Sequence, residues 1–198
     1  DEILIVDDGS TDPATVEEID RWGHRHSELI RVIRTENMGL PTARNTGAAA
    51  ATGDVFCFLD ADDWLGEEYF ERALYVLQTH PEVGAVTSWS DSFGIFNTMW
   101  APPHASFPDL FAECPSSPPA VVRADAYREA GGTSPDAAYA YEDWDLWLSM
   151  CGKEWIMATL PGGYIHYRMR PGSMSRSYRP ATVAHGRRIL AEHHAELF

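Results

Sequence analysis

Strand-like and helix-like segments alternate along the first 90 residues, and this alternation limits the chain to few folds. Short apolar runs at residues 2–8, 29–35, 54–59 and 82–89 have the length and composition of buried strands. Helical patterns separate them at residues 13–26, 42–51 and 67–80, with Thr11 or Asp12 as the cap of the first helix. Strands that alternate with helices favour βαβ units with right-handed crossovers. We therefore expect an α/β domain with a mostly parallel sheet flanked by helices.

The second half of the chain is less regular. Proline-rich and aromatic loops follow residue 90, and helical spacing returns at residues 142–152, where Gly152 marks the end of a helix. Two strands are expected at residues 154–160 and 163–169, and a last helix near residues 181–196. A chain of 198 residues fits one domain with a sizeable core. We divide this single domain into residues 1–90, residues 91–179 and a C-terminal helix at residues 180–198.

Composition and charge exclude several classes of function. The formal net charge of -15 argues against a nucleic-acid partner, because binding along a phosphate backbone requires clustered Lys and Arg. No apolar stretch approaches the roughly 20 residues that cross a bilayer, and no signal peptide opens the sequence. We expect a cytoplasmic protein without a transmembrane segment. A cytoplasmic protein bound to the inner face of a membrane would also agree with this expectation. Cys57, Cys114 and Cys151 show neither a disulfide framework nor zinc-like spacing.

Acidic side chains crowd the ends of two predicted strands. Asp7 and Asp8 close the first strand, and Asp60 and Asp62 follow the third in the stretch FLDADDW. Ligands of open parallel sheets bind outside the carboxyl ends of the strands, so both pairs should face one crevice. Carboxylates this close repel one another unless a cation, an arginine or water intervenes. Turns and helix caps alone also use such residues, and that simpler explanation stays open here.

Other acidic or nucleotide-binding motifs fit the sequence poorly. Haloacid-dehalogenase-like phosphatases also end a strand with D-x-D, but they normally place Thr or Val two positions after the second Asp, where Trp64 stands here. A Rossmann dehydrogenase requires G-x-G-x-x-G after a strand, and the sequence has no such run.

Three segments in order resemble family 2 glycosyltransferases with the GT-A fold: ILIVDDGSTD, ENMGLPTARNTGAAAATGDVFCFLDADD and YEDWDLWLSMCG. The resemblance extends from Asp1 to about Ser175. It implies an inverting transfer of a sugar from a nucleotide-diphosphate sugar, with a UDP-sugar favoured, to a hydroxyl group of a polysaccharide, a glycolipid or a natural product. Residues 1–90 would be the nucleotide-sugar-binding half and residues 91–179 the acceptor-side half. Family members normally open with a further strand, turn and helix, which this sequence does not include.

The resemblance also assigns roles to the acidic and basic residues. Asp7 and Asp8 would lie beside the nucleobase and ribose, Asp60 on the ribose side, and Arg44 near the nucleotide, where its planar fork suits a phosphate. An ordinary surface arginine on a helix would have the same appearance in the sequence.

A divalent cation is part of this expectation. Asp62 would reach Mg²⁺ or Mn²⁺ bridging the diphosphate, since both ions prefer oxygen ligands and share them with substrate phosphates. The family usually places a histidine two residues after the arginine of its C-terminal YR motif, and Arg170 stands there instead. Arg170 could then neutralise the diphosphate, and His166 could replace the histidine ligand.

Glu142 and Asp143 match the E-D pair of the family, in which the aspartate is the expected general base. Acids in the first turn of a helix also simply favour the helix dipole. Two other functions remain open: a nucleotidyltransferase that makes nucleotide sugars, and a noncatalytic module that binds them.

Overall fold

The first half of the chain folds largely as its apolar periodicity predicts. In the computed structural model the elements follow in the order β1 (Ile3–Asp8), α1 (Pro13–Arg25), β2 (Ile30–Thr35), α2 (Leu40–Ala50), β3 (Val55–Cys57), β4 (Trp64–Leu65) and α3 (Tyr69–Thr79). The short strand β4 is one that the sequence pattern does not predict. The structure describes residues 1–101, 110, 114, 119–137, 141–173 and 179–197, and the structural statements below concern these residues.

The second half contains longer strands than the pattern predicts. Its elements are β5 (Val83–Gly94), β6 (Thr98–Trp100), β7 (Val121–Arg123), α4 (Ala124–Glu129), the 3-10 helix η2 (Pro135–Ala137), α5 (Glu142–Cys151), β8 (Ile156–Met169), α6 (Pro180–His193) and the 3-10 helix η4 (Ala195–Leu197). The two strands expected around residues 154–169 form the single strand β8. A bulge at Pro161 and Gly162 accommodates this, because Pro161 has no N–H to donate and Gly162 adopts a φ of 151°.

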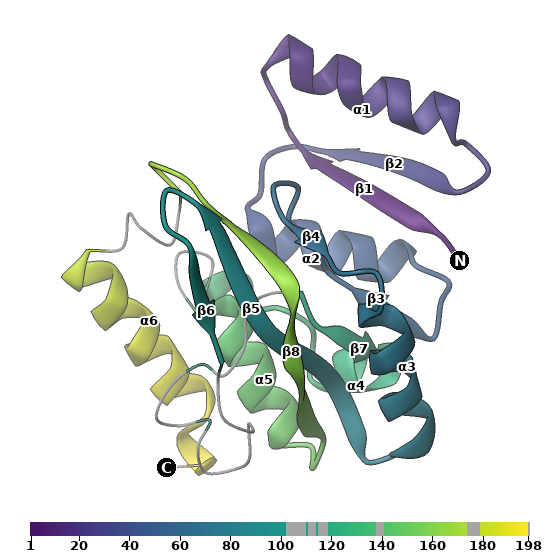
Figure 1. Cartoon of the computed structure of the whole chain (residues 1–198). Coiled ribbons are helices and arrows are strands. Elements are labelled where there is room, and N and C mark those ends of the chain that lie inside the picture. Colours follow the sequence, from purple (N-terminus) through teal and green to yellow (C-terminus); the bar gives the residue numbers. More distant parts are fainter. Residues whose placement is uncertain (102–109, 111–113, 115–118, 138–140, 174–178, 198) are drawn as a thin grey trace.

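The described strands form two sheets (Figure 1). β1 and β2 pair in parallel, with Ile3 opposite Ile30 and Asp8 opposite Thr35. The larger sheet has the order β3-β7-β5-β8-β4, and β6 pairs with β5. Figure 1 shows α1 on one side of the β1–β2 pair and α2 on the other. The end of β1 therefore delivers Asp8 next to the loop that leads from β2 into α2.

The α/β class with a sheet flanked by helices is confirmed, but the larger sheet is mixed rather than mostly parallel. β5 and β8 run parallel, whereas β3 and β7, β4 and β8, β5 and β6, and β5 and β7 pair in antiparallel fashion. Parallel neighbours need a crossover of a dozen or more residues, while a short hairpin joins only antiparallel strands. Residues 95–97 form such a short connection between β5 and β6, so these two strands are antiparallel.

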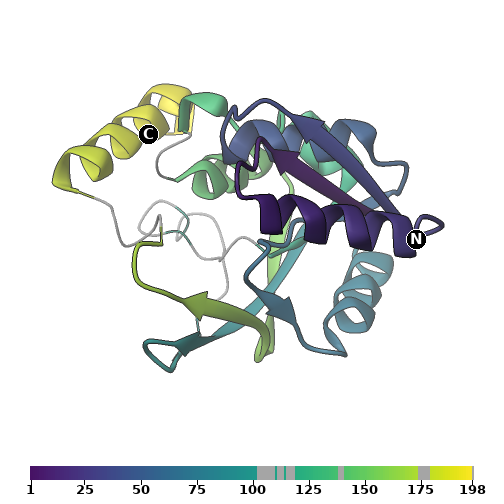
Figure 2. The ribbon, with the colours of Figure 1, turned by 90° about the horizontal axis from the view of Figure 1, so that it is seen from above.

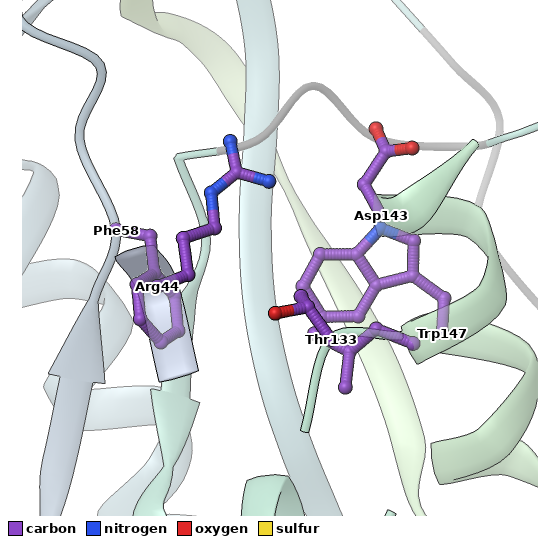
Figure 3. A pocket seen from close by; sticks show the side chains of 6 residues that line it. Arg44, Phe58, Thr133, Asp143 and Trp147 are labelled. Carbon is purple, nitrogen blue, oxygen red and sulfur yellow. The ribbon is translucent and has the colours of Figure 1, made fainter. Parts of the chain in front are cut away.

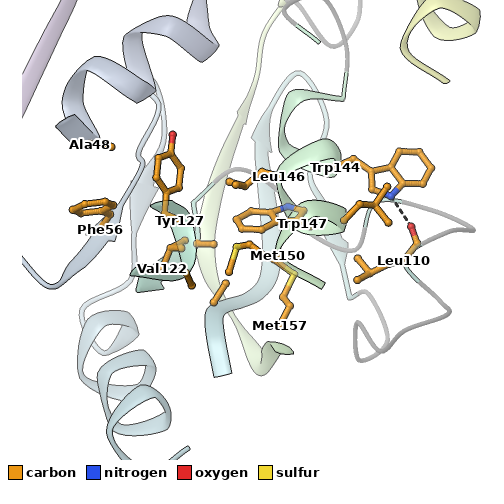
Figure 4. Packing of buried hydrophobic residues seen from close by; sticks show 14 of the residues in the cluster. Ala48, Phe56, Leu110, Val122, Tyr127, Trp144, Leu146, Trp147, Met150 and Met157 are labelled. Carbon is orange, nitrogen blue, oxygen red and sulfur yellow. Dashed lines mark hydrogen bonds between the residues drawn. The ribbon is translucent and has the colours of Figure 1, made fainter. Parts of the chain in front are cut away.

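Alternate residues of the larger sheet belong to two separate cores. Val86 and Val121 pack in one cluster with Tyr69 of α3. Their neighbours Ala85 and Val122 pack in the other cluster with the aromatic and aliphatic side chains of α4 and α5 (Figure 4). Successive side chains of a strand point to opposite faces of its sheet. The sheet is thus covered by α3 on one face and by α4 and α5 on the other.

The C-terminal helix α6 is attached to α5. Leu190 of α6 joins the same core cluster as the apolar residues of α5. The carboxylate of Asp145 accepts hydrogen bonds from His193 Nδ1 at 3.0 Å and from His194 Nε2 at 2.9 Å. Seen from above, α6 lies at the opposite end of the molecule from α1 (Figure 2).

The helix ends follow the signals in the sequence. The Asp12 carboxylate accepts a hydrogen bond from the backbone N–H of Thr15 at 3.0 Å, which makes Asp12 the N-cap of α1, and Gly152 is the C-cap of α5. The longest described helix, α6, has 14 residues. Among the described residues, none of the helices combines the length and apolar character that a membrane span requires.

Candidate active site

Arg44 connects parts of the chain that are far apart in sequence. It lies on α2 with 8% of its surface exposed. Its Nη1 donates to Glu142 Oε1 at 3.1 Å and its Nη2 donates to Asp60 Oδ1 at 3.2 Å. The first contact spans 98 residues of sequence. One guanidinium therefore brings the loop after β3 and the first turn of α5 together.

Two neighbouring carboxylates begin α5. Tyr141, the N-cap, has a φ of 71°, and Glu142 and Asp143 follow in the first turn, where the helix dipole favours negative charge. Burial and the adjacent Asp143 raise the pKa of Glu142 to about 7. Burial also raises the pKa of Asp143, and the positive charge of Arg44 partly offsets this. Carboxyl groups with raised pKa values in a recess are suited to accept protons.

A small cavity lies beside Arg44 and Asp143 (Figure 3). Its volume is about 10 Å³, and it is lined by Arg44, Phe58, Thr133, Asp143, Leu146 and Trp147. Figure 3 shows the Arg44 guanidinium and the Asp143 carboxylate on opposite sides of this space, with the aromatic rings of Phe58 and Trp147 below them. An arginine and a carboxyl group thus flank a cavity whose remaining lining is largely apolar.

Asp7 and Asp8 use their carboxylates within the chain. Asp7 accepts from the backbone N–H of Ser10 at 2.9 Å and pairs with Arg34 at 2.8 Å, and hydrogen bonds from Ser10 hold its pKa below the usual range. Asp8 accepts from the backbone N–H of Gly39 at 2.8 Å. Gly39, with a φ of 88°, is the N-cap of α2, the helix that carries Arg44. Asp8 therefore fixes the start of α2.

The acidic loop after β3 is held against the end of β8. Asp63 Oδ1 accepts from the backbone N–H of Arg168 at 2.7 Å, and the Asp62 carbonyl accepts from Arg168 Nε at 2.9 Å. Asp62 Oδ2 pairs with Arg170 Nε at 2.8 Å. Burial raises the pKa of Asp63 to about 6. Arg168 near the end of β8 and Arg170 just after it thus offset part of the repulsion within the acidic loop.

The fit of a divalent cation depends on Asp62. Its side chain is 32% exposed at the edge of the site. His166 is placed differently, since its Nδ1 lies 3.8 Å from Asp91 Oδ2 and its ring lies 5.6 Å from that of Trp64. No three His, Cys, Asp or Glu side chains among the described residues form a cluster that could hold a metal. Mg²⁺ and Mn²⁺ at substrate phosphates commonly take one or two carboxylates plus water, and Asp62 fits that pattern.

The structure brings together part of the set that the sequence singles out. Arg44 joins Asp60 to Glu142, and Arg170 joins Asp62, whereas Asp7, Asp8 and His166 have other partners. The sequence reasoning missed Arg168, Phe58 and Trp147. Arg168 lies two residues before Arg170 and could have been found by that spacing, while Phe58 and Trp147 look like ordinary core residues.

Comparison with known proteins gives consistent matches. A family model described as Glycosyl transferase family 2 matches residues 1–131. Glycosyltransferase GlyA of Streptococcus pneumoniae is 37% identical over 100 residues, which are 48% of this chain and 14% of that protein. Amylovoran biosynthesis glycosyltransferase AmsE of Erwinia amylovora is 30% identical over 179 residues, which are 87% of this chain and 65% of that protein.

Two solved structures share the fold. The crystal structure of S. aureus TarS in complex with UDP-GlcNAc superposes with a TM-score of 0.74 at 18% identity and covers 97% of this chain and 57% of that chain. The mannosyltransferase PcManGT from Pyrobaculum calidifontis, in complex with GDP-Man and Mn²⁺, gives a TM-score of 0.67 at 20% identity and covers 98% and 54%. The chain spans less than two thirds of the length of each of these four proteins. The GT-A fold expected from the sequence is confirmed, and because the family model covers more than half of the chain, the chain belongs to glycosyl transferase family 2.

Proposed function

We propose that this chain is the catalytic core of an inverting glycosyltransferase that moves a sugar from a nucleotide-diphosphate sugar to a hydroxyl group. The observation that carries the proposal is the position of Arg44 between Asp60 and Glu142. Arg44 thereby links the loop after β3, which would face the donor, to α5, which would supply the base. Family membership supports the same class of reaction.

Asp143 is the proposed general base. The acceptor oxygen would form a bond to the anomeric carbon while the bond from that carbon to the diphosphate oxygen breaks, and Asp143 would take the hydroxyl proton. Attack from the face opposite the leaving group inverts the anomeric centre. The raised pKa of Asp143 supports this role, because a stronger base accepts the proton more readily. Glu142, which accepts a hydrogen bond from Arg44, would hold the Arg44 side chain against the first turn of α5.

Negative charge builds on the departing diphosphate, and positive charge nearby would stabilise it. We assign this to Arg170, whose side chain is 63% exposed beside Asp62 and therefore accessible to a ligand. Asp62 would hold Mg²⁺ or Mn²⁺, which when bound supplies further charge neutralisation at the diphosphate. His166 would contribute to the cation only if its ring left Asp91.

The nucleotide is assigned to the side of Asp7, Asp8 and Asp60. Each carboxylate oxygen can accept more than one hydrogen bond, so Asp7 and Asp8 retain capacity for a base N–H or a sugar hydroxyl beside their internal bonds. A UDP-sugar is the favoured donor, and the binding of UDP-GlcNAc by TarS, which shares the fold, is in keeping with this. The proposed acceptor is a glycan of the cell envelope, a choice supported by the name of AmsE, which refers to amylovoran biosynthesis.

The test begins with nucleotide binding. UDP, GDP and other nucleoside diphosphates are added with Mn²⁺, and the melting temperature is measured, because a ligand that binds the folded form raises it. A nucleotide sugar that binds is then assayed for release of its nucleoside diphosphate, without formation or consumption of pyrophosphate. Pyrophosphate turnover would instead indicate a nucleotidyltransferase. No thermal shift with any nucleotide would refute the proposal.

Asp143→Asn tests the base, with Asp136→Asn, at an exposed position of the 3-10 helix η2, as the matched control. We expect Asp143→Asn to lower the rate by roughly 10²- to 10⁴-fold while the thermal shift with nucleotide is kept. The control should turn over like the wild type. Equal rates for wild type and Asp143→Asn would exclude Asp143 as the base.

A further inference from the structure

The indole N–H of Trp147 is a buried donor for which the described part of the chain supplies no acceptor. Trp147 lies on α5 with 3% of its surface exposed, and its Nε1 has no hydrogen-bond partner. Buried polar groups in native proteins are nearly always hydrogen-bonded, and a buried Trp N–H usually finds a partner. An N–H in this position therefore points to a bound molecule.

The other buried tryptophan of α5 behaves differently. Trp144 Nε1 donates to the carbonyl of Leu110 at 2.5 Å, the bond drawn in Figure 4. The two indoles share one helix, similar burial and the same core cluster. They differ in that the Trp144 N–H is used within the fold, while the Trp147 N–H has no partner among the described residues.

Trp147 borders the small cavity beside the proposed base. It follows Asp143 by four residues, so both side chains lie on one face of α5. Figure 3 shows its indole nitrogen on the edge of the ring nearest Asp143. A cavity of about 10 Å³ has room for one water molecule and none for a sugar ring. Thr133 also lines it, but its hydroxyl is engaged elsewhere, within hydrogen-bond distance of Pro41 O at 2.9 Å, Asn45 Oδ1 at 3.1 Å and the Tyr127 hydroxyl at 3.3 Å.

We propose that this cavity binds one water molecule that accepts a hydrogen bond from Trp147 Nε1–H and donates to the Asp143 carboxylate. Trp147 and Asp143 give the water two partners, within the two to four that ordered waters have. Trp147 is then a positioning residue that acts on Asp143 through the water. The catalytic consequence rests on the proposed function, whereas the water site itself does not.

The water adds a donor where Asp143 has few. The described groups that face Asp143 are the backbone N–H of Trp144, which donates to Asp143 Oδ1 at 2.8 Å, Arg44 from α2, Glu142 on the same helix, and the Cys114 thiol, whose Sγ lies 3.7 Å from Asp143 Oδ2. Donors to a carboxylate favour its ionised form, while burial opposes it. Removal of the water should therefore raise the pH at which Asp143 loses its proton.

The test replaces only the N–H. In Trp147→3-benzothienylalanine a sulfur takes the place of the indole N–H and the bicyclic shape is kept. The same replacement at Trp144 is the matched control. We expect the acidic limb of the kcat profile to move up by about one pH unit for the Trp147 variant, with kcat above the limb and KM unchanged. The Trp144 variant should keep the limb and lose stability, because the Leu110 carbonyl loses its donor.

A crystal structure of the wild type provides a readout without turnover. An ordered water within hydrogen-bond distance of both Trp147 Nε1 and Asp143 is the expected result, and its absence would overturn the proposal even if the enzyme is active. A change in KM without movement of the acidic limb would also overturn it, since the N–H would then contact a substrate hydroxyl directly. If no nucleotide sugar is turned over, the proposed function fails while the crystal still decides on the water.

Discussion

Glu142→Gln should reduce the pH dependence of folding stability. Glu142 is 6% exposed, and burial together with Asp143 raises its pKa from 4.5 to about 7. Between these two pH values the folded form holds a proton on Glu142 that the unfolded form releases. The stabilisation from this raised pKa is complete below about 4.5 and is lost as the pH rises through about 7.

The magnitude follows from the two pKa values. The interval from 4.5 to about 7, at about 1.4 kcal/mol for each pH unit, corresponds to about 3 kcal/mol. Relative to Glu142→Gln, the wild type should lose this amount between pH 4.5 and pH 8. For a chain of this size the difference corresponds to roughly 10 °C in melting temperature. Glutamine cannot ionise but can still accept a hydrogen bond from Arg44 through its side-chain oxygen.

Urea unfolding followed by tryptophan fluorescence at pH 5, 6, 7 and 8 measures this difference. The free energy of unfolding of Glu142→Gln minus that of the wild type should increase with pH. Glu67→Gln, at an exposed position, is the control and should run parallel to the wild type. If Glu142→Gln also ran parallel, Arg44 would compensate the ionised Glu142 completely, and the reasoning from burial would be refuted.

Three further changes test the contacts around the site, each by urea unfolding at pH 7.5. Arg44→Met leaves two carboxylates without their cation and should lower the free energy of unfolding by about 3–5 kcal/mol. The loss should be smaller at pH 6, where one carboxyl group can take a proton, and a loss independent of pH would contradict this reasoning. Asp8→Asn leaves one of its backbone donors, such as Gly39 N–H, unpaired and should cost about 1–3 kcal/mol, whereas an unchanged stability would show that the loop is held otherwise. Tyr69→Phe removes the hydroxyl that lies 3.0 Å from the Val86 carbonyl and should cost about 1–2 kcal/mol with the fold intact, so a neutral result would exclude that bond.

The catalytic assignments came from local motifs that the sequence carries in short stretches. The acids at the ends of the strands, the E-D pair and the family resemblance could all be recognised within single continuous segments of the sequence. The residue that pairs with each acid could not be recognised in this way. Arg44 meets Glu142 across 98 residues, and Arg170 meets Asp62 although they belong to different strands or loops. Such pairs depend on how the sheet is assembled, which local patterns do not encode.

The water site illustrates the same limit. In the sequence Trp144 and Trp147 are equivalent, because both fall on the apolar face of one helix. Only the packing around them shows that the carbonyl of Leu110 reaches Trp144, while Trp147 borders a cavity. Whether a hydrogen-bond donor finds an acceptor depends on the residues that lie near it in space, which the sequence pattern does not show.

The sequence by itself determined the elements of this protein wherever short-range physics decides: the alternation of strands and helices up to residue 90, a cap at Thr11 or Asp12, which the structure assigns to Asp12, and the stop at Gly152. The tertiary structure decided the rest: the antiparallel strands β4, β6 and β7 and the continuous strand β8 through its bulge at Gly162. Short strands have little periodicity of their own, and their hydrogen bonds go to partners distant in sequence. Periodicity records which face of a segment is buried, whereas pairing depends on which segment lies against it.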